Sequence, residues 1–146
     1  MAQAKSIIAT IKRTIRSVAN FSNGNRVFAE QLPLKIKMFI NENLNGKSIA
    51  LIEKNKESKN YRYEVTLNDD TQLTFNENGE WTTVINRING VATGIITSAI
   101  FRFAYFCFPE ASIVTIKRQA TGYQTILSNN IVLKFNNQGQ IYGLAS

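Results

Sequence analysis

The fold is decided by residues 32–81, which read LPLKIKMFINENLNGKSIALIEKNKESKNYRYEVTLNDDTQLTFNENGEW. A helix is predicted to open at Leu32-Pro33, because the apolar residues that follow fall at i, i+3, i+4 and i+8. These residues are Ile36, Phe39, Ile40 and Leu44. Four segments of alternating apolar and polar residues come next, separated by links rich in Asn, Asp and Gly. The stretch therefore predicts one α-helix followed by a four-stranded antiparallel meander.

Residues 96–141 repeat this pattern. An offset of 64 residues aligns the helix and the first strand, and it pairs Ile36 with Ile100. An offset of 60 residues aligns the other strands, and it pairs Phe75 with Phe135. The change of offset falls in residues 55–60, a predicted hairpin tip, where a change of length is tolerated. We therefore expect an α+β fold of two tandem repeats, each a helix with a four-strand antiparallel meander, whose strands join into one sheet.

The N-terminal part of the chain carries most of the positive charge. Residues 1–37 hold seven of the 17 Lys and Arg residues but only one of the ten acids, and the formal net charge of the chain is +7. Residues 4–19 are predicted to form an amphipathic helix with its cations beside an apolar stripe. The cations are Lys5, Lys12, Arg13 and Arg16. We expect this helix to pack on the protein itself; an anionic membrane surface is the alternative, and nucleic acid is not expected as a partner.

The chain is expected to contain three segments. Residues 1–31 form the basic amphipathic helix and its linker, residues 32–90 the first repeat, and residues 91–146 the second repeat. A hydrophobic content of 44% and only two prolines are typical of a packed globular protein. We expect the two repeats to form one compact domain.

The composition argues against catalysis. The chain has no histidine, so no imidazole is available as a general base or metal ligand. Cys107 is the single cysteine, and without an activating base we expect a buried, inert thiol rather than a nucleophile. Asp69 and Asp70 share a turn, where two carboxylates alone would make a poor calcium site. We therefore predict no enzymatic activity, no cofactor and no metal.

Each predicted repeat carries its own set of short motifs. The first repeat carries Leu32-Pro33, Tyr63-Glu64-Val65 and Phe75-Asn76-Glu77-Asn78-Gly79-Glu80-Trp81. The second carries Phe108-Pro109-Glu110-Ala111, Leu127-Ser128-Asn129 and Leu133-Lys134-Phe135-Asn136. In these motifs the chain resembles the PepSY-like domain family, which is related in fold to the β-lactamase inhibitor protein. The resemblance covers residues 32–144.

The resemblance implies one continuous curved sheet with the helices on one face and the other face open. It also implies a periplasmic or cell-envelope location and no catalytic residues, and the inhibitor relative grips its enzyme with the open face of its sheet. No export signal is visible here, because Lys12, Arg13 and Arg16 interrupt the apolar N-terminal segment, so a cytoplasmic location is the alternative. No apolar run reaches the 18 residues of a membrane span.

The candidate partner-binding site lies on the open face of the second repeat. Strand alternation directs six of its residues to that face, namely Gln124, Ile126, Val132, Lys134, Tyr142 and Leu144. The corresponding face of the first repeat is polar, so apolar groups here indicate a contact patch. The alternative is that a loop or the N-terminal helix covers them, or that scattered surface apolar residues have no function.

The second helix is more apolar than the first. Ile95, Phe101, Tyr105, Phe106 and Cys107 add apolar groups outside the stripe that both helices share. A helix that is apolar nearly all round needs cover on more than one side, and we favour the N-terminal helix over a second subunit as that cover. We accordingly expect a non-catalytic module that binds a protein or peptide, as an inhibitor or envelope sensor. A homo-oligomeric structural protein is the alternative, and a small-molecule carrier the weaker one.

Overall fold

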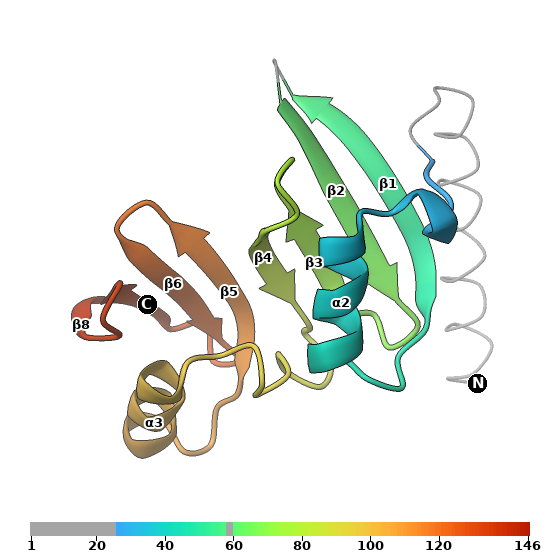
Figure 1. The fold of residues 1–146 in the computed structure, drawn as a ribbon. Coiled ribbons are helices and arrows are strands. Elements are labelled where there is room, and N and C mark those ends of the chain that lie inside the picture. Colours follow the sequence, from blue (N-terminus) through green and yellow to red (C-terminus); the bar gives the residue numbers. More distant parts are fainter. Residues whose placement is uncertain (1–25, 58–59) are drawn as a thin grey trace, which may run out of the picture.

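The computed structural model describes residues 26–57 and 60–146 (Figure 1). Within these residues the chain forms one open antiparallel sheet of eight strands, in the order β1 to β8, with two α-helices. The strands are β1 Ile49–Glu57, β2 Asn60–Leu67, β3 Gln72–Phe75, β4 Trp81–Ile85, β5 Ile113–Gln119, β6 Gly122–Leu127, β7 Val132–Asn136 and β8 Ile141–Ala145. The predicted α+β class with an antiparallel sheet is confirmed.

The two helices cover the same face of the sheet (Figure 1). A short 3-10 helix, η1 Ala29–Gln31, precedes α2 Leu34–Asn43, and α3 Ser98–Cys107 follows β4. Phe39 of α2 meets Phe75 of β3 edge to face, with ring centroids 5.6 Å apart. Phe103 of α3 meets Phe135 of β7 in the same way at 5.7 Å. The amphipathic helix predicted for residues 4–19 lies outside the described residues.

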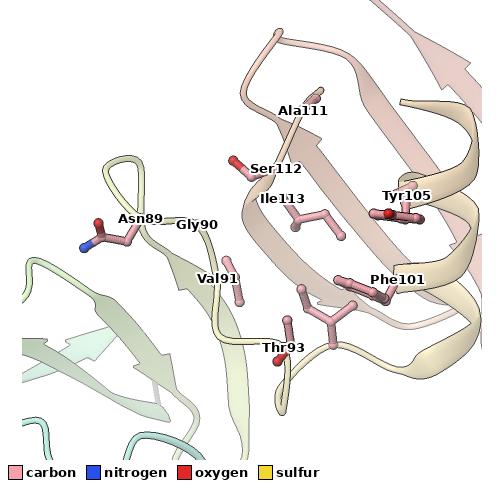
Figure 2. A pocket seen from close by; sticks show the side chains of 11 residues that line it. Asn89, Gly90, Val91, Thr93, Phe101, Tyr105, Ala111, Ser112 and Ile113 are labelled. Atoms are coloured by element: carbon pink, nitrogen blue, oxygen red, sulfur yellow. The ribbon is translucent and has the colours of Figure 1, made fainter. Parts of the chain in front are cut away.

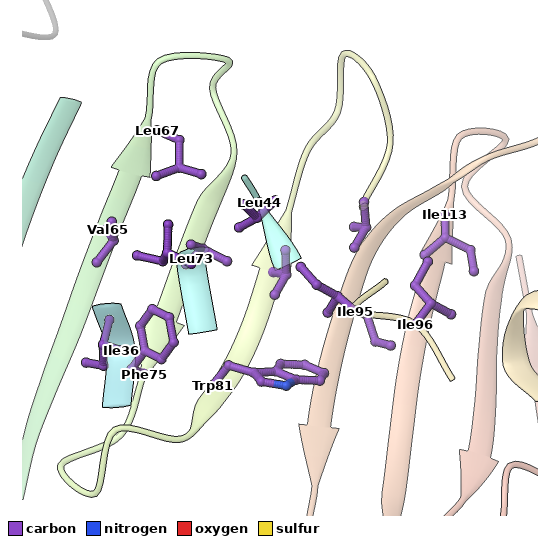
Figure 3. Close-up of a cluster of buried hydrophobic side chains, with 14 of the residues drawn as sticks. Ile36, Leu44, Val65, Leu67, Leu73, Phe75, Trp81, Ile95, Ile96 and Ile113 are labelled. Carbon is purple, nitrogen blue, oxygen red and sulfur yellow. The ribbon is translucent and has the colours of Figure 1, made fainter. Parts of the chain in front are cut away.

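A row of buried side chains crosses the helix-covered face of the sheet. Directly opposed residues of antiparallel strands share a face, so the strand register identifies the row. Its buried members, from β1 to β7, are Ile52, Val65, Leu73, Val84, Ile116, Thr125 and Leu133. Figure 3 shows Leu73, Phe75 and Trp81 on the strands with Ile36 and Leu44 from the α2 region packed over them. Burying each large apolar side chain contributes about 1.5–3 kcal/mol, so this face carries the core.

Two hairpins use the same turn chemistry, as their composition predicts. In the turn between β3 and β4 the Asn76 side-chain oxygen accepts hydrogen bonds from the backbone N–H groups of Asn78 and Glu80, both at 3.0 Å. Asn136 does the same in the turn between β7 and β8, at 3.0 and 2.9 Å. Both turns include a glycine at φ +80°, a conformation that glycine adopts without steric cost.

The hairpin of β1 and β2 is longer than its sequence predicts. Residues 55–57 and 60 belong to the strands, where Lys56 pairs with Tyr61 and Glu57 with Asn60. The expectation of a loop over residues 55–60 is therefore wrong in most of that range. The antiparallel ladder continues because each added pair of residues gains its own backbone hydrogen bonds without altering the register.

The two edges of the sheet differ. At the β1 edge Arg26 forms a bridge with Glu53, and the Val27 N–H donates to the Ile52 carbonyl at 3.2 Å. The β8 edge has no such strand partner among the described residues. The second half of the sheet therefore ends in a strand that is paired on one side only.

Candidate functional site

The helix-free face of the sheet carries a row of apolar side chains that runs from β4 to β8. The register places Ile85 of β4 beside Thr115, then Ile126, Val132 and finally Ala145 of β8. Ile85, Ile126 and Val132 are partly exposed and Ala145 is exposed. No helix in the described part of the chain covers this row (Figure 1). Partly exposed apolar side chains gathered on a sheet face without helical cover are typical of a contact surface.

Thr115 lies in the middle of the apolar row. Its side chain is only 2% exposed, and its hydroxyl oxygen has no hydrogen-bond partner. A buried hydroxyl without a partner costs about 1–3 kcal/mol. Thr115 therefore adds an unsatisfied polar group to a row that is otherwise apolar.

A second row on the same face, two residues away along each strand, carries positive charge. Lys117 of β5 lies opposite Gln124 of β6, which lies opposite Lys134 of β7. Both lysines are exposed, and the Gln119 side-chain amide donates to the Gln124 side-chain oxygen at 3.1 Å. Adjacent strands are about 4.8 Å apart, which separates the two lysine positions by about 10 Å. We call Lys117, Gln124 and Lys134 the lysine row.

The structure corrects the prediction for one site residue. Leu144 was expected on the open face, but it lies opposite Leu133, so its side chain is on the helix-covered face. The cause is a register shift between Lys134 and Phe135, where Ile141 pairs with Phe135 but Gly143 pairs with Lys134. Leu144 is therefore in line with the buried row of the helix-covered face. Its side chain is nevertheless 59% exposed, because no ninth strand lies beyond β8 in the described sheet.

Four of the other predicted residues come together on the open face. Gln124, Ile126, Val132 and Lys134 occupy neighbouring positions of β6 and β7. Tyr142 is the residue that the register shift leaves unpaired, between Ile141 opposite Phe135 and Gly143 opposite Lys134, and its side chain is 57% exposed. Their role in partner binding stays a prediction.

Sequence reasoning missed three members of this surface, Ile85, Thr115 and Lys117. A signal for the last two was present, because Ile116 occupies a core position and strand alternation directs both of its neighbours to the opposite face. Ile85 required the pairing of β4 with β5, which joins the two halves of the sheet.

The open face of the first half is mostly polar and partly acidic, and it includes the apolar Leu51 opposite Thr66. Glu53 and Glu64 lie opposite each other, and Glu64 pairs with the Arg62 guanidinium at 3.1 Å. Burial raises the pKa of Glu53 above its ordinary value of 4.5, and the Glu64 carboxylate raises it further. The open face therefore has acids at β1 and β2 and lysines at β5 and β7.

Asp69 has a structural role in the turn between β2 and β3. Its carboxylate accepts a hydrogen bond from the Thr71 backbone N–H at 3.0 Å and lies 3.6 Å from the Lys47 ammonium group. Burial alone would raise the pKa of Asp69, but the hydrogen bonds from Thr71 and the charge of Lys47 outweigh it and hold the pKa below its ordinary value of 3.8. These contacts explain the residue without a metal.

We expect this carboxylate to make stability depend on pH. Because the pKa of Asp69 is lower in the folded state, its contribution is fully present above the unfolded value of 3.8 and is lost as the pH falls through the folded value. Urea unfolding across the acid range should show that Asp69→Asn is less stable than the wild type near neutrality and that the gap closes in acid. A gap that stays constant with pH would contradict this role, and Lys47→Ala should narrow the gap.

Trp81 belongs to the core and is buried. Its ring lies 6.5 Å from that of Phe39 and 6.4 Å from that of Tyr123, so it links α2 to the second half of the sheet. The Arg118 guanidinium lies 4.2 Å above the indole. Trp81 therefore packs at the junction between the halves.

Cys107 is exposed, so the expectation of a buried thiol is wrong. It is the last residue of α3, whose buried residues are Ile100 and Ala104. Across residues 26–57 and 60–146 no three acidic, Cys or His side chains form a group that could hold a metal ion. The part of the chain with described coordinates also contains no helix long and apolar enough to cross a membrane.

Comparisons with known proteins agree with this architecture. The family described as "Putative beta-lactamase-inhibitor-like, PepSY-like" matches residues 61–142. No curated protein matches the sequence. A protein from Bacteroides thetaiotaomicron, described as a putative calcium-regulated periplasmic protein, is similar in structure with a TM-score of 0.79 and 24% identity. The similarity covers 84% of this chain and 96% of that one.

Two further similar structures come from Bacteroides vulgatus. Both are described as putative periplasmic proteins, one of them of unknown function. The first has a TM-score of 0.76 at 23% identity, and the similarity covers 83% of this chain and 95% of that protein's chain. The other has a TM-score of 0.76 at 25% identity, and the similarity covers 82% of this chain and 95% of that protein's chain. The sheet with two helices is thus a fold shared with these proteins.

Proposed function

This chain belongs to the PepSY-like, β-lactamase-inhibitor-like family, and from that premise we propose that it is a non-catalytic module that binds a protein or peptide. The binding surface is the helix-free face of β4 to β8. The observation that carries this proposal is the apolar row of Ile85, Ile126 and Val132 on a face without helical cover. Apolar groups at the centre with charged groups beside them are the usual anatomy of a protein interface.

The chemistry of the surface selects the kind of partner. Lys117 and Lys134 lie in one row beside the apolar row, with the neutral Gln124 between them. A partner with an apolar ridge and two carboxylates about 10 Å apart would match both rows. The acids of the opposite half, Glu53 and Glu64, disfavour binding of such a partner there.

We further propose that the two halves, residues 32–90 and 91–146, are tandem repeats. The matching turns of Asn76 and Asn136 support this, as do the matching contacts of Phe39 with Phe75 and Phe103 with Phe135. On the open face the matched positions differ, since Thr66 and Thr82 stand where the second half has Ile126 and Tyr142. Apolar groups present only in the second copy are not needed for the common fold.

The periplasmic descriptions of the similar structures support an envelope location for this module. For the cations Lys5, Lys12, Arg13 and Arg16 we propose packing of their helix on the protein rather than binding to a membrane surface or nucleic acid. The test of function is therefore best made with envelope proteins.

Affinity capture from a native cell-envelope extract tests the proposed surface. Ile126→Ser combined with Tyr142→Ser removes exposed apolar contacts while leaving the buried row intact. We expect the double variant to capture about one tenth or less of the partner that the wild type captures. Large side chains at the centre of an interface carry most of the affinity. Equal capture by two proteins with the same unfolding midpoint would contradict binding on this face.

A further inference from the structure

Within the described residues, β8 is the last strand of the sheet and pairs on one side only (Figure 1). Edge strands of soluble proteins commonly carry charged residues or proline, which hinder pairing with another chain. β8 has neither, since its sequence from Ile141 to Ala145 reads IYGLA. At the other edge, the bridge of Arg26 with Glu53 already occupies part of β1. Of the two edges of the described sheet, β8 is therefore the one that is open to a further strand.

The matched strand of the first half shows what a further strand does. Val84 of β4 stands sixty residues before Leu144, and each lies opposite a buried leucine of the preceding strand. β4 has the same register shift as β8 and nevertheless pairs with β5, where Ile116 lies opposite Val84. Val84 is fully buried, whereas Leu144 is 59% exposed. A ninth strand would bury Leu144 as β5 buries Val84.

The backbone of Leu144 is suited to this pairing. Residues of an antiparallel strand alternate between hydrogen-bonding to one neighbouring strand and to the other. On β7, the Asn136 N–H donates to the Gln140 carbonyl at 2.8 Å, so Leu133, three residues earlier, directs its backbone groups to β6. Leu144 lies opposite Leu133 and accordingly directs its own N–H and carbonyl away from β7. These two groups are the donor and acceptor that a ninth strand needs.

Lys134 brings a positive charge to this edge. It lies opposite Gly143, and a Cβ atom on Gly143 would be 3.4 to 3.7 Å from the Cβ, Cγ and Cδ atoms of Lys134. Because Gly143 has no side chain, the lysine stem has room to lie over β8. Lys134 has no acidic partner within residues 26–57 and 60–146. Its ammonium group is thus available to a carboxylate at the edge of the sheet.

We propose that β8 binds an extended acidic segment of the partner as a ninth, antiparallel strand. This inference rests on the proposed function, since it names the part of the partner that the module binds. The segment residue opposite Leu144 is apolar and lies on the helix-covered face, as Ile116 does beside Val84. The next residue lies opposite Gly143 on the open face, where an Asp or Glu side chain meets the Lys134 ammonium group. Strand addition gains affinity from main-chain hydrogen bonds and selectivity from alternate side chains.

A second copy of the chain matches this edge less well. Antiparallel pairing of two β8 strands makes one continuous sheet, so the Lys134 side chains of both copies lie on the same face beside the junction. Like charges on neighbouring strands are destabilising, and β8 has no acid to compensate them. The formal net charge of +7 also repels a second copy and attracts an acidic segment.

The pocket beside α3 is a separate place where an apolar side chain of a peptide could lodge (Figure 2). It has a volume of about 200 Å³, and Phe101, Tyr105 and Ile113 are among the residues that line it. An apolar cavity of about 150 Å³ can hold benzene, so the pocket has room for one ring. No residue of β8 lines it, so the signals of its residues distinguish binding there from binding at the edge.

NMR titration of the full chain with the peptide Thr-Val-Glu-Val-Glu-Val-Thr tests the proposal. We expect the Leu144 amide to shift and to become protected from hydrogen exchange, whereas Tyr105 and Ile113 stay unchanged. Lys134→Gln should weaken binding about two- to fivefold, the range of an exposed ion pair. Lys117→Gln is the matched control, because Lys117 belongs to the same row but lies three strands from the edge, and it should leave binding unchanged.

Leu144→Pro removes the N–H group that the added strand needs. Proline is tolerated in an edge strand where its N–H would face solvent, so the fold should be retained. We expect at least about tenfold weaker binding, because the peptide carbonyl loses its donor and meets the proline ring. The comparison of Lys134→Gln with Lys117→Gln does not depend on this variant.

Three results would overturn the proposal: no binding of the acidic peptide, equal binding of Thr-Val-Lys-Val-Lys-Val-Thr, or binding that folded Leu144→Pro leaves unchanged. Peptide-induced shifts at Tyr105 and Ile113 in place of Leu144 would assign the binding to the pocket and overturn it too. So would a Leu144 amide that is protected without peptide, since residues 1–25 or a second copy would then occupy the edge.

Envelope capture separates this inference from the proposed function. If Leu144→Pro captures the partner as the wild type does, while Ile126→Ser with Tyr142→Ser loses it, the open face binds the partner and the added strand is wrong. If the acidic peptide binds β8 as expected, while Ile126→Ser with Tyr142→Ser captures the partner fully, the added strand holds and the proposed open-face surface is wrong.

Discussion

Replacing Phe135 with alanine is expected to lower the free energy of unfolding by about 3–5 kcal/mol. Phe135 is fully buried in β7, meets Phe103 of α3 edge to face and lies opposite Tyr123 and Ile141. Removing its ring opens a cavity between the second helix and the sheet, and the surrounding side chains relax only partly into it.

Urea unfolding followed by circular dichroism measures the change. Phe106→Ala is the control, because Phe106 is also a phenylalanine of the second half but is exposed, and its effect on stability should stay within about 0.5 kcal/mol. Equal losses in both variants would contradict the assignment of Phe135 to the core and of Phe106 to the surface.

Gly122→Ala is expected to destabilise the fold by about 3 kcal/mol or more. Gly122 has φ +154°, and a Cβ atom there would overlap the carbonyl oxygen of Phe135 and lie 2.7 Å from the backbone of Asn136. Gly122 pairs with Asn136 across β6 and β7, so relief of the overlap would require these strands to separate.

Gly46→Ala separates the cost of the positive φ from the cost of the steric overlap. Gly46 also has a positive φ, of +85°, but a Cβ atom there would meet nothing within 4 Å. It should therefore cost only about 1 kcal/mol, from backbone conformation alone. Thermal melts of both variants measure the difference, and a Gly122→Ala protein as stable as Gly46→Ala would contradict the close approach of β6 and β7.

The fold could be predicted because the core follows local periodicity. The helical spacing of Ile36 and Ile40 and the alternation around Leu73 and Phe75 directly indicate which side chains are buried. The turn residues reinforce this pattern, since Asn76 makes the side-chain hydrogen bonds that its type favours. These features depend on neighbours in the chain, so one sequence is enough to read them.

The errors occur where a distant contact or an element's end decides the outcome. Leu144 changes face because of a register shift against β7, which alternation along β8 alone does not reveal. Cys107 is exposed because α3 ends there, although the apolar pattern continues through it. The β1–β2 hairpin extends because residues 55–57 pair with residues 60–62, and residues 55–57 have no apolar alternation that would mark them as a strand.

The candidate site was predictable in part for the same reason. Alternation placed Ile126 and Val132 together and also signalled Lys117 beside Ile116, but Ile85 joined them only through the pairing of β4 with β5. That pairing connects the two halves of the sheet and has no local signal in the sequence. The surface is therefore larger and more basic than the predicted set of residues.

The central claim is that the open face of the second half binds a partner. The first half has the same fold, but its open face does not bind that partner. Envelope capture with two double variants tests it most directly: Ile126→Ser with Tyr142→Ser, and Thr66→Ala with Thr82→Ala at the matched positions of the first half. We predict that the second-half variant loses the captured partner while the first-half variant retains it at the wild-type level. Equal retention by both variants, or loss only in the first-half variant, would contradict the claim.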